Sequence, residues 1–161
     1  MRKHSKDESK TVLLIEDNPS WITLIRYSLP DSIRLDYVVT LQEGIKRISN
    51  YDVLILDLIL PDSQDPLQTF LQIFQETRET RLPIIVISAQ DDMNIQREIL
   101  NYCISGYIDK GKWDRKYFID LLNNVIEEPP IQSHEQQFQS LHCLLNTLPT
   151  SDLVSLTSFF L

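Results

Sequence analysis

The sequence lacks the features of membrane proteins and of disulfide-stabilised secreted domains. No apolar run approaches the roughly 20 residues that cross a bilayer, and the N-terminus does not resemble a signal peptide. The two cysteines, Cys103 and Cys143, are far apart and have no metal-type spacing. We therefore expect a soluble, cytoplasmic protein with reduced core thiols and no membrane partner.

Positive charge is also scarce, above all toward the C-terminus. The formal net charge is -8, and no Lys or Arg follows Lys116. Affinity for nucleic acid comes mainly from Lys and Arg side chains that neutralise phosphates, so the composition argues against a nucleic-acid partner. Basic residues do gather within residues 1–10, which we expect to be a disordered lead-in.

Short runs rich in β-branched residues alternate with helical patterns through residues 11–128, which we expect to form one domain. The runs are 11–16, 33–39, 52–57, 83–88 and 106–109, and the helical patterns that follow them are 19–29, 41–49, 66–78, 92–104 and 113–127. Five such units predict an α/β fold, a doubly wound five-stranded parallel sheet with helices on both faces. The runs VLILD and IIVIS are apolar without alternation, which is typical of central strands.

Residues 129–161 are expected to form a linker and an α-helical C-terminal extension. Pro129 and Pro130 close the preceding domain, and Ser133 with Gln136 fits a capping box. The helix that this box opens has apolar positions at Phe138, Leu141, Leu145 and Leu148. The chain then ends on apolar residues that need a partner: the domain itself, a second copy of the chain, or a downstream domain.

Polar residues stand where the expected strands end. Asp57 interrupts the aliphatic run VLILDLIL, and an isolated buried carboxylate costs several kcal/mol or more, so it must lie at an edge or have partners. Glu16 and Asp17 end the first run, Ser88 ends the fourth, and Lys110 follows the fifth. Because ligands bind outside the carboxyl ends of parallel strands, these side chains should share one site.

Three carboxylates at one edge repel one another by about 4 kcal/mol per pair at ~4 Å and an effective dielectric of ~20. A hard divalent cation relieves this repulsion, and without Cys or His nearby the first choice is Mg²⁺. Lys110 and Ser88 supply the kinds of donor that suit the oxygens of a phosphoryl group.

Four stretches of the chain resemble the receiver domain of two-component response regulators, over residues 11 to about 127. They are LLIEDNP, LILDLILPD, IIVISAQ and GYIDKG. The resemblance implies a flavodoxin-like strand order of 2-1-3-4-5. It also implies that Asp57 accepts a phosphoryl group from a sensor histidine kinase or a phosphotransfer protein, which forms an acyl phosphate. The Mg²⁺ ligands would be Asp17, Asp57 and the backbone carbonyl of Ile59, with Glu16 acting through a water.

The same resemblance assigns a switch. Lys110 would neutralise charge during transfer, the Ser88 hydroxyl would turn onto the new phosphoryl oxygen, and Tyr107 would swing inward behind it. This would change the surface of 92–104, 106–109 and 113–127, which would bind a downstream protein target. That surface and the C-terminal helix are also candidate homodimer contacts. The domain would catalyse its own phosphorylation and dephosphorylation without turning over a separate substrate.

Some residues depart from the family pattern. Asp65-Pro66 stands where receivers usually have glycine, and Gly111 stands where proline usually follows the lysine. These departures affect the loop geometry and the lifetime of the phosphorylated state. Trp21, after the acidic pair, is expected in the core or on a kinase-docking surface.

Three alternative functions stay open on the sequence. The same residues suit a Mg²⁺-dependent phosphohydrolase that uses Asp57 as nucleophile, although no substrate cap is evident. The loop departures suit a pseudo-receiver that acts as an adaptor without phosphorylation. The apolar C-terminus suits an N-terminal fragment of a larger regulator whose output domain is missing.

Overall fold

The structure is a computed structural model that describes residues 9–89, 92–102 and 104–127. Its elements are β1 (Lys10–Ile15), α1 (Pro19–Ser28), β2 (Ile33–Val38), α2 (Leu41–Arg47), η1 (Ile48–Asn50), β3 (Val53–Leu56), α3 (Pro66–Thr77), β4 (Ile84–Ser88), α4 (Met93–Leu100), β5 (Gly106–Asp109), η2 (Lys110–Lys112) and α5 (Arg115–Glu127). The strands form one sheet in the order β2-β1-β3-β4-β5, and every pairing is parallel. The predicted fold class and strand order are confirmed.

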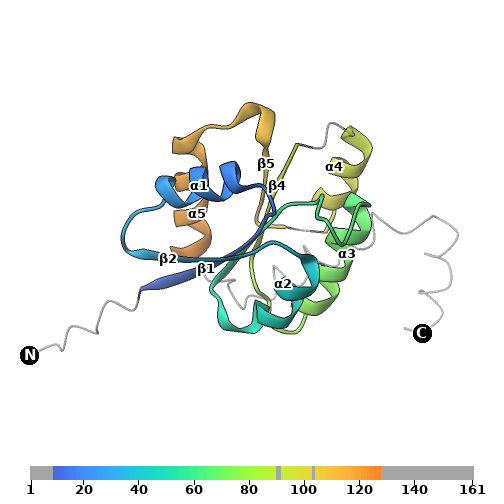
Figure 1. The fold of residues 1–161 in the computed structure, drawn as a ribbon, viewed down its shortest axis with the longest axis horizontal. Coiled ribbons are helices and arrows are strands. Elements are labelled where there is room, and N and C mark those ends of the chain that lie inside the picture. The colour runs from blue at the N-terminus through green and yellow to red at the C-terminus, as the bar shows by residue number, and fades with distance from the viewer. Residues whose placement is uncertain (1–8, 90–91, 103, 128–161) are drawn as a thin grey trace, which may run out of the picture.

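Helices cover both faces of the sheet, α1 and α5 on one face and α2, α3 and α4 on the other (Figure 1). Successive residues of a strand point to opposite faces, and β1 shows this directly. Val12 and Leu14 pack in the cluster under α1 and α5, whereas Leu13 and Ile15 pack under the other three helices. The apolar core therefore has two halves that share the strands.

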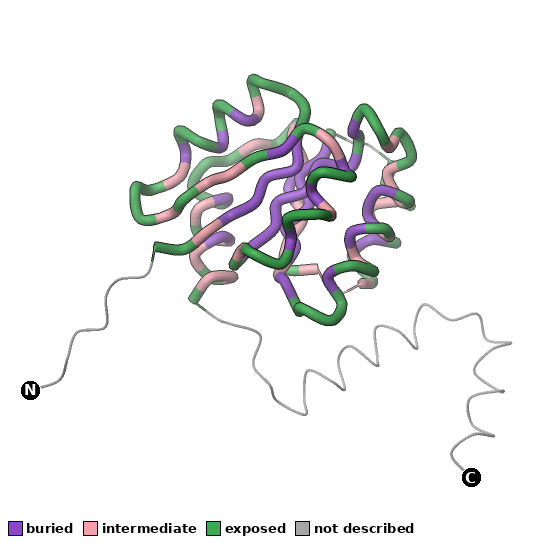
Figure 2. The backbone as a smooth tube through the Cα atoms, turned by 60° about the horizontal axis from the view of Figure 1, so that its bottom comes forward, coloured by how far each residue is buried: buried purple, intermediate pink, exposed green. Residues whose placement is uncertain are grey.

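The middle of the sheet is the most deeply buried part of the described chain (Figure 2). Every residue of β3 and of β4 is buried, as expected for strands covered on both faces. β2, at one edge of the sheet, is mostly half-buried or exposed. The two apolar runs that predicted central strands are thus confirmed as central strands.

Helix starts next to the carboxyl edge of the sheet are capped by side chains. Asn18 accepts a hydrogen bond from the Ser20 N–H at the start of α1, and Asp65 accepts one from the Gln68 N–H at the start of α3. Both caps satisfy backbone donors that the first helical turn leaves without partners. A proline follows each cap in the first turn, where its missing N–H costs nothing.

Three boundaries differ from the sequence-based expectation or cannot be compared with it. β1 begins at Lys10, one residue inside the expected lead-in, because the strand pairs with β2 from Lys10 onward. α4 ends at Leu100 rather than at 104, in a tighter turn in which the Tyr102 N–H donates to the Ile99 carbonyl. The expected extension 129–161 and both cysteines lie outside the described residues. In the part of the chain that the structure describes, no helix is long and apolar enough to cross a membrane.

Candidate functional site

β1 and β3 end side by side, and β4 continues past them from Val86 to Ser88, so the polar residues at these strand ends meet at one edge of the sheet. Leu56 pairs with Ile15 on one side and with Val86 on the other. The N–H of Asp57, which directly follows β3, donates to the Ile15 carbonyl at 2.9 Å. Asp57 therefore leaves the sheet beside Glu16, as the sequence predicted.

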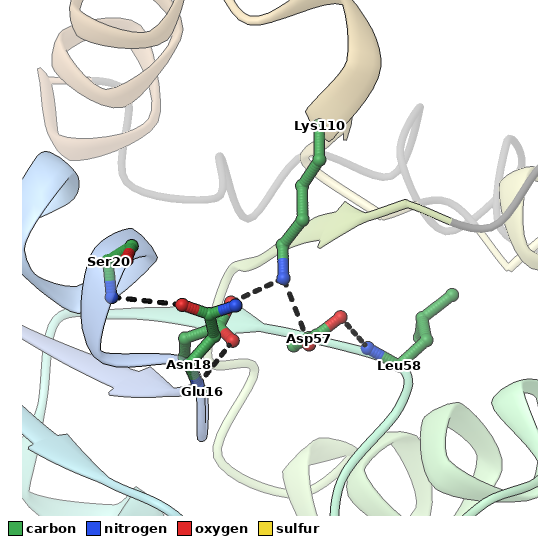
Figure 3. Close-up of polar contacts among 6 residues, drawn as sticks. All are labelled: Glu16, Asn18, Ser20, Asp57, Leu58 and Lys110. Atoms are coloured by element: carbon green, nitrogen blue, oxygen red, sulfur yellow. Dashed lines mark hydrogen bonds and ion pairs between the residues drawn. The ribbon is translucent and has the colours of Figure 1, made fainter.

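Lys110 reaches into this edge and joins the two buried carboxylates (Figure 3). Its Nζ lies 2.6 Å from Glu16 Oε2 and 3.0 Å from Asp57 Oδ2. The side chains of Lys110, Glu16 and Asp57 are only 8%, 0% and 7% exposed, respectively. The three charges interact with little screening by water, but their removal from water offsets much of this attraction. The network is therefore sensitive to the loss of any member, because the charges left behind would be buried without compensation.

Asp57 uses its two carboxylate oxygens differently. Oδ2 faces the Lys110 ammonium, and Oδ1 accepts the Leu58 N–H at 2.8 Å. Burial raises the pKa of Asp57 above its ordinary value, although the Lys110 charge and the backbone N–H groups of Ile59 and Leu58 oppose the rise. The geometry fixes the orientation of the carboxylate while burial leaves its negative charge only partly compensated.

The pKa of Glu16 is also raised, for similar reasons. Burial raises the pKa of its carboxyl and the nearby charge of Asp57 adds to the rise, against the opposing hydrogen bonds from Lys110 and from the Asn18 N–H at 3.0 Å. Two buried carboxylates thus share one lysine. A further positive charge at this edge would stabilise both of them.

Asp17 supplies a third carboxylate that opens toward solvent. It is exposed, whereas Glu16 and Asp57 are buried, and one carboxylate oxygen from each of the three lies within 4.8 Å of the others. An all-oxygen donor group of this kind fits a hard divalent cation. Ile59 follows Asp57 by two residues, and its side chain is exposed; its carbonyl as a metal ligand stays a prediction.

The two proposed switch residues lie on neighbouring strands. Ser88 ends β4 and is 1% exposed, opposite Asp109 in the register with β5. Tyr107, within β5, is partly buried against the core half that α2, α3 and α4 cover. Both lie at the strand positions expected from the sequence, and their movement on phosphorylation stays a prediction.

Asp62, in the loop after Asp57, is a residue that the sequence reasoning missed. It accepts the N–H groups of Leu41 and Gln42 at 2.8 and 3.0 Å and so caps the start of α2. These bonds outweigh the effect of burial and lower the pKa of Asp62. The Leu60 and Ser63 backbones exchange two hydrogen bonds around it. The sequence does indicate a turn with a carboxylate, because Asp62 stands between Pro61 and Ser63. The spacing of residues could not show that this carboxylate binds the N–H groups of Leu41 and Gln42, which lie about 20 residues earlier in the chain.

Residues 12–129 match the response regulator receiver domain family. The chain belongs to this family. This receiver domain, a module of two-component signalling, is 27% identical over 141 residues to hybrid signal transduction histidine kinase D of Dictyostelium discoideum. That alignment covers 85% of this chain and 9% of the kinase, so the chain spans a small part of the length of that relative.

Solved receiver structures share the fold. A CheY-like response regulator receiver domain protein from Methanospirillum hungatei JF-1 is similar at a TM-score of 0.63 and 16% identity, over 73% of this chain and 94% of that one. The receiver domain of a sensor histidine kinase from Pseudomonas aeruginosa PAO1 is similar at a TM-score of 0.62 and 24% identity, over 74% and 99%. The Pseudomonas structure holds a magnesium ion coordinated in its active site cleft.

Proposed function

We propose that this receiver domain accepts a phosphoryl group on Asp57 from a phosphohistidine of a sensor histidine kinase or a phosphotransfer protein. The observation that carries the proposal is the buried Lys110 ammonium, 3.0 Å from Asp57 Oδ2 and 2.6 Å from Glu16 Oε2. An ordinary surface lysine is surrounded by water, whereas the Lys110 side chain is 8% exposed and contacts two buried carboxylates. A lysine held beside a nucleophilic carboxylate is what phosphoryl transfer requires, because the reaction depends on positioning and charge neutralisation.

Mg²⁺ is the cofactor that the donor set favours. Asp17, Asp57 and the Ile59 carbonyl would hold it, with Glu16 acting through a water. Support comes from the three carboxylates within 4.8 Å and from the magnesium ion in the Pseudomonas receiver. When bound, Mg²⁺ supplies positive charge next to the phosphoryl oxygens.

The chain's own residues then have distinct roles in the transfer. An Asp57 oxygen attacks phosphorus as the bond to the donor imidazole nitrogen breaks, and the imidazole leaves with the electron pair. Lys110 stabilises the negative charge on the phosphoryl oxygens. The Ser88 hydroxyl donates to one of these oxygens, and Tyr107 follows it inward.

The output would be a changed protein surface. Tyr107 lies within β5 and packs in the core half that α4 helps to cover. The surface of α4, β5 and α5 would then bind a downstream protein target in one phosphorylation state and not in the other. The same surface, or the C-terminal segment, would serve a homodimer if the target is a second copy. Both outcomes are population shifts caused by one acyl phosphate.

Acetyl phosphate with Mg²⁺ tests the proposal without a kinase. The full chain should acquire one acid-stable, base-labile phosphoryl group, and the Asp57→Asn variant should acquire none. Asp52→Asn is the matched control, since Asp52 lies at the opposite end of β3 and should leave labelling unchanged. A wild-type chain that stays unlabelled while another receiver labels under the same conditions would overturn the proposal and favour the adaptor function.

A further inference from the structure

The two tryptophans of the chain meet beside the phosphoacceptor site. Trp21 lies on α1 and Trp113 directly follows η2, which begins with Lys110. Their rings pack edge to face, with centroids 5.4 Å apart and an interplanar angle of 75°. The Trp113 ring also lies 5.1 Å from that of Phe118, which is fully buried. Trp21 is thus braced against the core through a second aromatic ring.

The face of Trp21 is turned to the site lysine. Lys110 Nζ lies 5.3 Å from the centroid of the Trp21 ring, which is within the range of a cation–π interaction. Because the ammonium also contacts Glu16 and Asp57, it has carboxylates and an aromatic face around it. Its side chain is only 8% exposed, which strengthens the attraction to the ring.

We propose that Trp21 is a positioning residue for Lys110. Its ring holds the ammonium at the phosphoacceptor carboxylate and covers it against water, and Trp113 holds the ring in place. The proposal rests on the proposed function, since it concerns the same transfer to Asp57. It assigns to Trp21 a role that is separate from contact with a kinase.

A ring suits this task better than another polar group would. Lysine has a flexible stem and a strongly hydrated charge, so it needs outside help to stay in one position. A further carboxylate would hold it but would also repel the incoming phosphoryl group. The ring attracts the cation through its quadrupole and adds no net charge. Trp21 therefore fixes the lysine without competing with the phosphoryl oxygens.

The test measures phosphorylation by acetyl phosphate with Mg²⁺, a reaction that involves no kinase docking. Trp21→Ala should lower the rate constant by about 5- to 20-fold. Trp21→Phe, which keeps a ring, should recover most of it. Tyr27→Ala is the matched control on the same helix, because Tyr27 is 79% exposed, and it should leave the rate unchanged.

A spectroscopic readout separates positioning from a merely structural role. In a Trp113→Phe background, Trp21 is the sole fluorophore of its type. Without added ligands, Lys110→Met in that background should shift the Trp21 emission, because the cation over the ring is lost, whereas Lys112→Met, at a side chain that is 85% exposed, should not. This readout decides the proposal if Trp21→Ala fails to fold in a parallel thermal scan.

Two results would overturn the proposal. One is a Trp21→Ala rate within twofold of wild type, and the other is a ligand-free Trp21 emission that is the same with and without the Lys110 ammonium. Failure of the proposed function looks different, because the wild-type chain itself would then not be labelled.

Discussion

A lysine and an aspartate meet at both ends of the sheet, and the two pairs differ in their surroundings. At the amino end, Lys10 Nζ lies 3.7 Å from Asp52 Oδ1, with side chains 49% and 40% exposed. At the carboxyl end, Lys110 Nζ lies 3.0 Å from Asp57 Oδ2, with side chains 8% and 7% exposed. The first pair is a solvated surface contact, and the second is closed off from water.

The pKa values of the two aspartates move in opposite directions. Burial tends to raise the pKa of Asp52, but hydrogen bonds from the Thr11 N–H at 2.7 Å and the Thr11 hydroxyl at 2.9 Å lower it overall, with help from Lys10. For Asp57 burial prevails and raises the pKa despite Lys110. At the amino end, the bonds between Thr11 and Asp52 therefore join β1 to the start of β3. At the carboxyl end, Glu16 and Asp57 keep negative charge that a further cation could compensate.

The largest effect is expected from Lys110→Met. Loss of the ammonium leaves Glu16 and Asp57 buried without their cation, which should lower the free energy of unfolding by about 3 kcal/mol. Phosphorylation by acetyl phosphate should fall about 100-fold or more. Urea denaturation and labelling rates measure the two effects. Lys112→Met is the control, since the Lys112 side chain is 85% exposed. If the Lys110 variant were labelled as fast as this control, Lys110 would have no role in phosphorylation.

Asp62→Asn should have an intermediate effect. Leu41 and Gln42 donate to different oxygens of Asp62, and in Asn one of these oxygens is replaced by an NH2 group that cannot accept. We expect the free energy of unfolding to fall by about 1–2 kcal/mol and labelling of Asp57 to slow, because the loop that follows Asp57 is then held less firmly. Asp65→Asn should change stability little, since Asn caps helices as well as Asp does. Equal effects of the two variants would show that Asp62 has no special role.

At the amino end, Asp52→Asn should lower the free energy of unfolding by about 1 kcal/mol at pH 7. The pKa of Asp52 is lowered on folding, so its contribution is present above the unfolded pKa of ~3.9 and is lost as the pH falls through the folded value. The difference between wild type and variant should shrink below about pH 4. Denaturation curves from pH 3 to 7 test this, and a difference that grows on acidification would contradict it.

The smallest effect is expected from Lys10→Met. The ion pair with Asp52 is long and exposed, and exposed pairs contribute about 0–1 kcal/mol. We expect a change in the free energy of unfolding below ~0.5 kcal/mol and unchanged labelling of Asp57. An effect as large as that of Lys110→Met would mean that the two ends of the sheet do not differ as described.

Much of this arrangement could be predicted from the sequence, because it follows from local pattern. Uninterrupted apolar runs predicted β3 and β4, and the alternation of strands and helices placed Asp57 and Lys110 at the same edge. Other features depend on how loops fold back in space. Asp62 accepts hydrogen bonds from the start of α2, and Trp113 packs against Trp21. Neither contact could be predicted from the spacing of residues along the chain.

The most direct measurement is the position of the phosphoryl group. Reduction of the labelled chain with borohydride converts an aspartyl phosphate to a homoserine residue, which peptide mass spectrometry locates. We expect this conversion at position 57, and we expect it to depend on Mg²⁺ and Lys110. Conversion at Asp17 or at Asp52, or no conversion in a chain that is labelled, would show that Asp57 is not the phosphoacceptor.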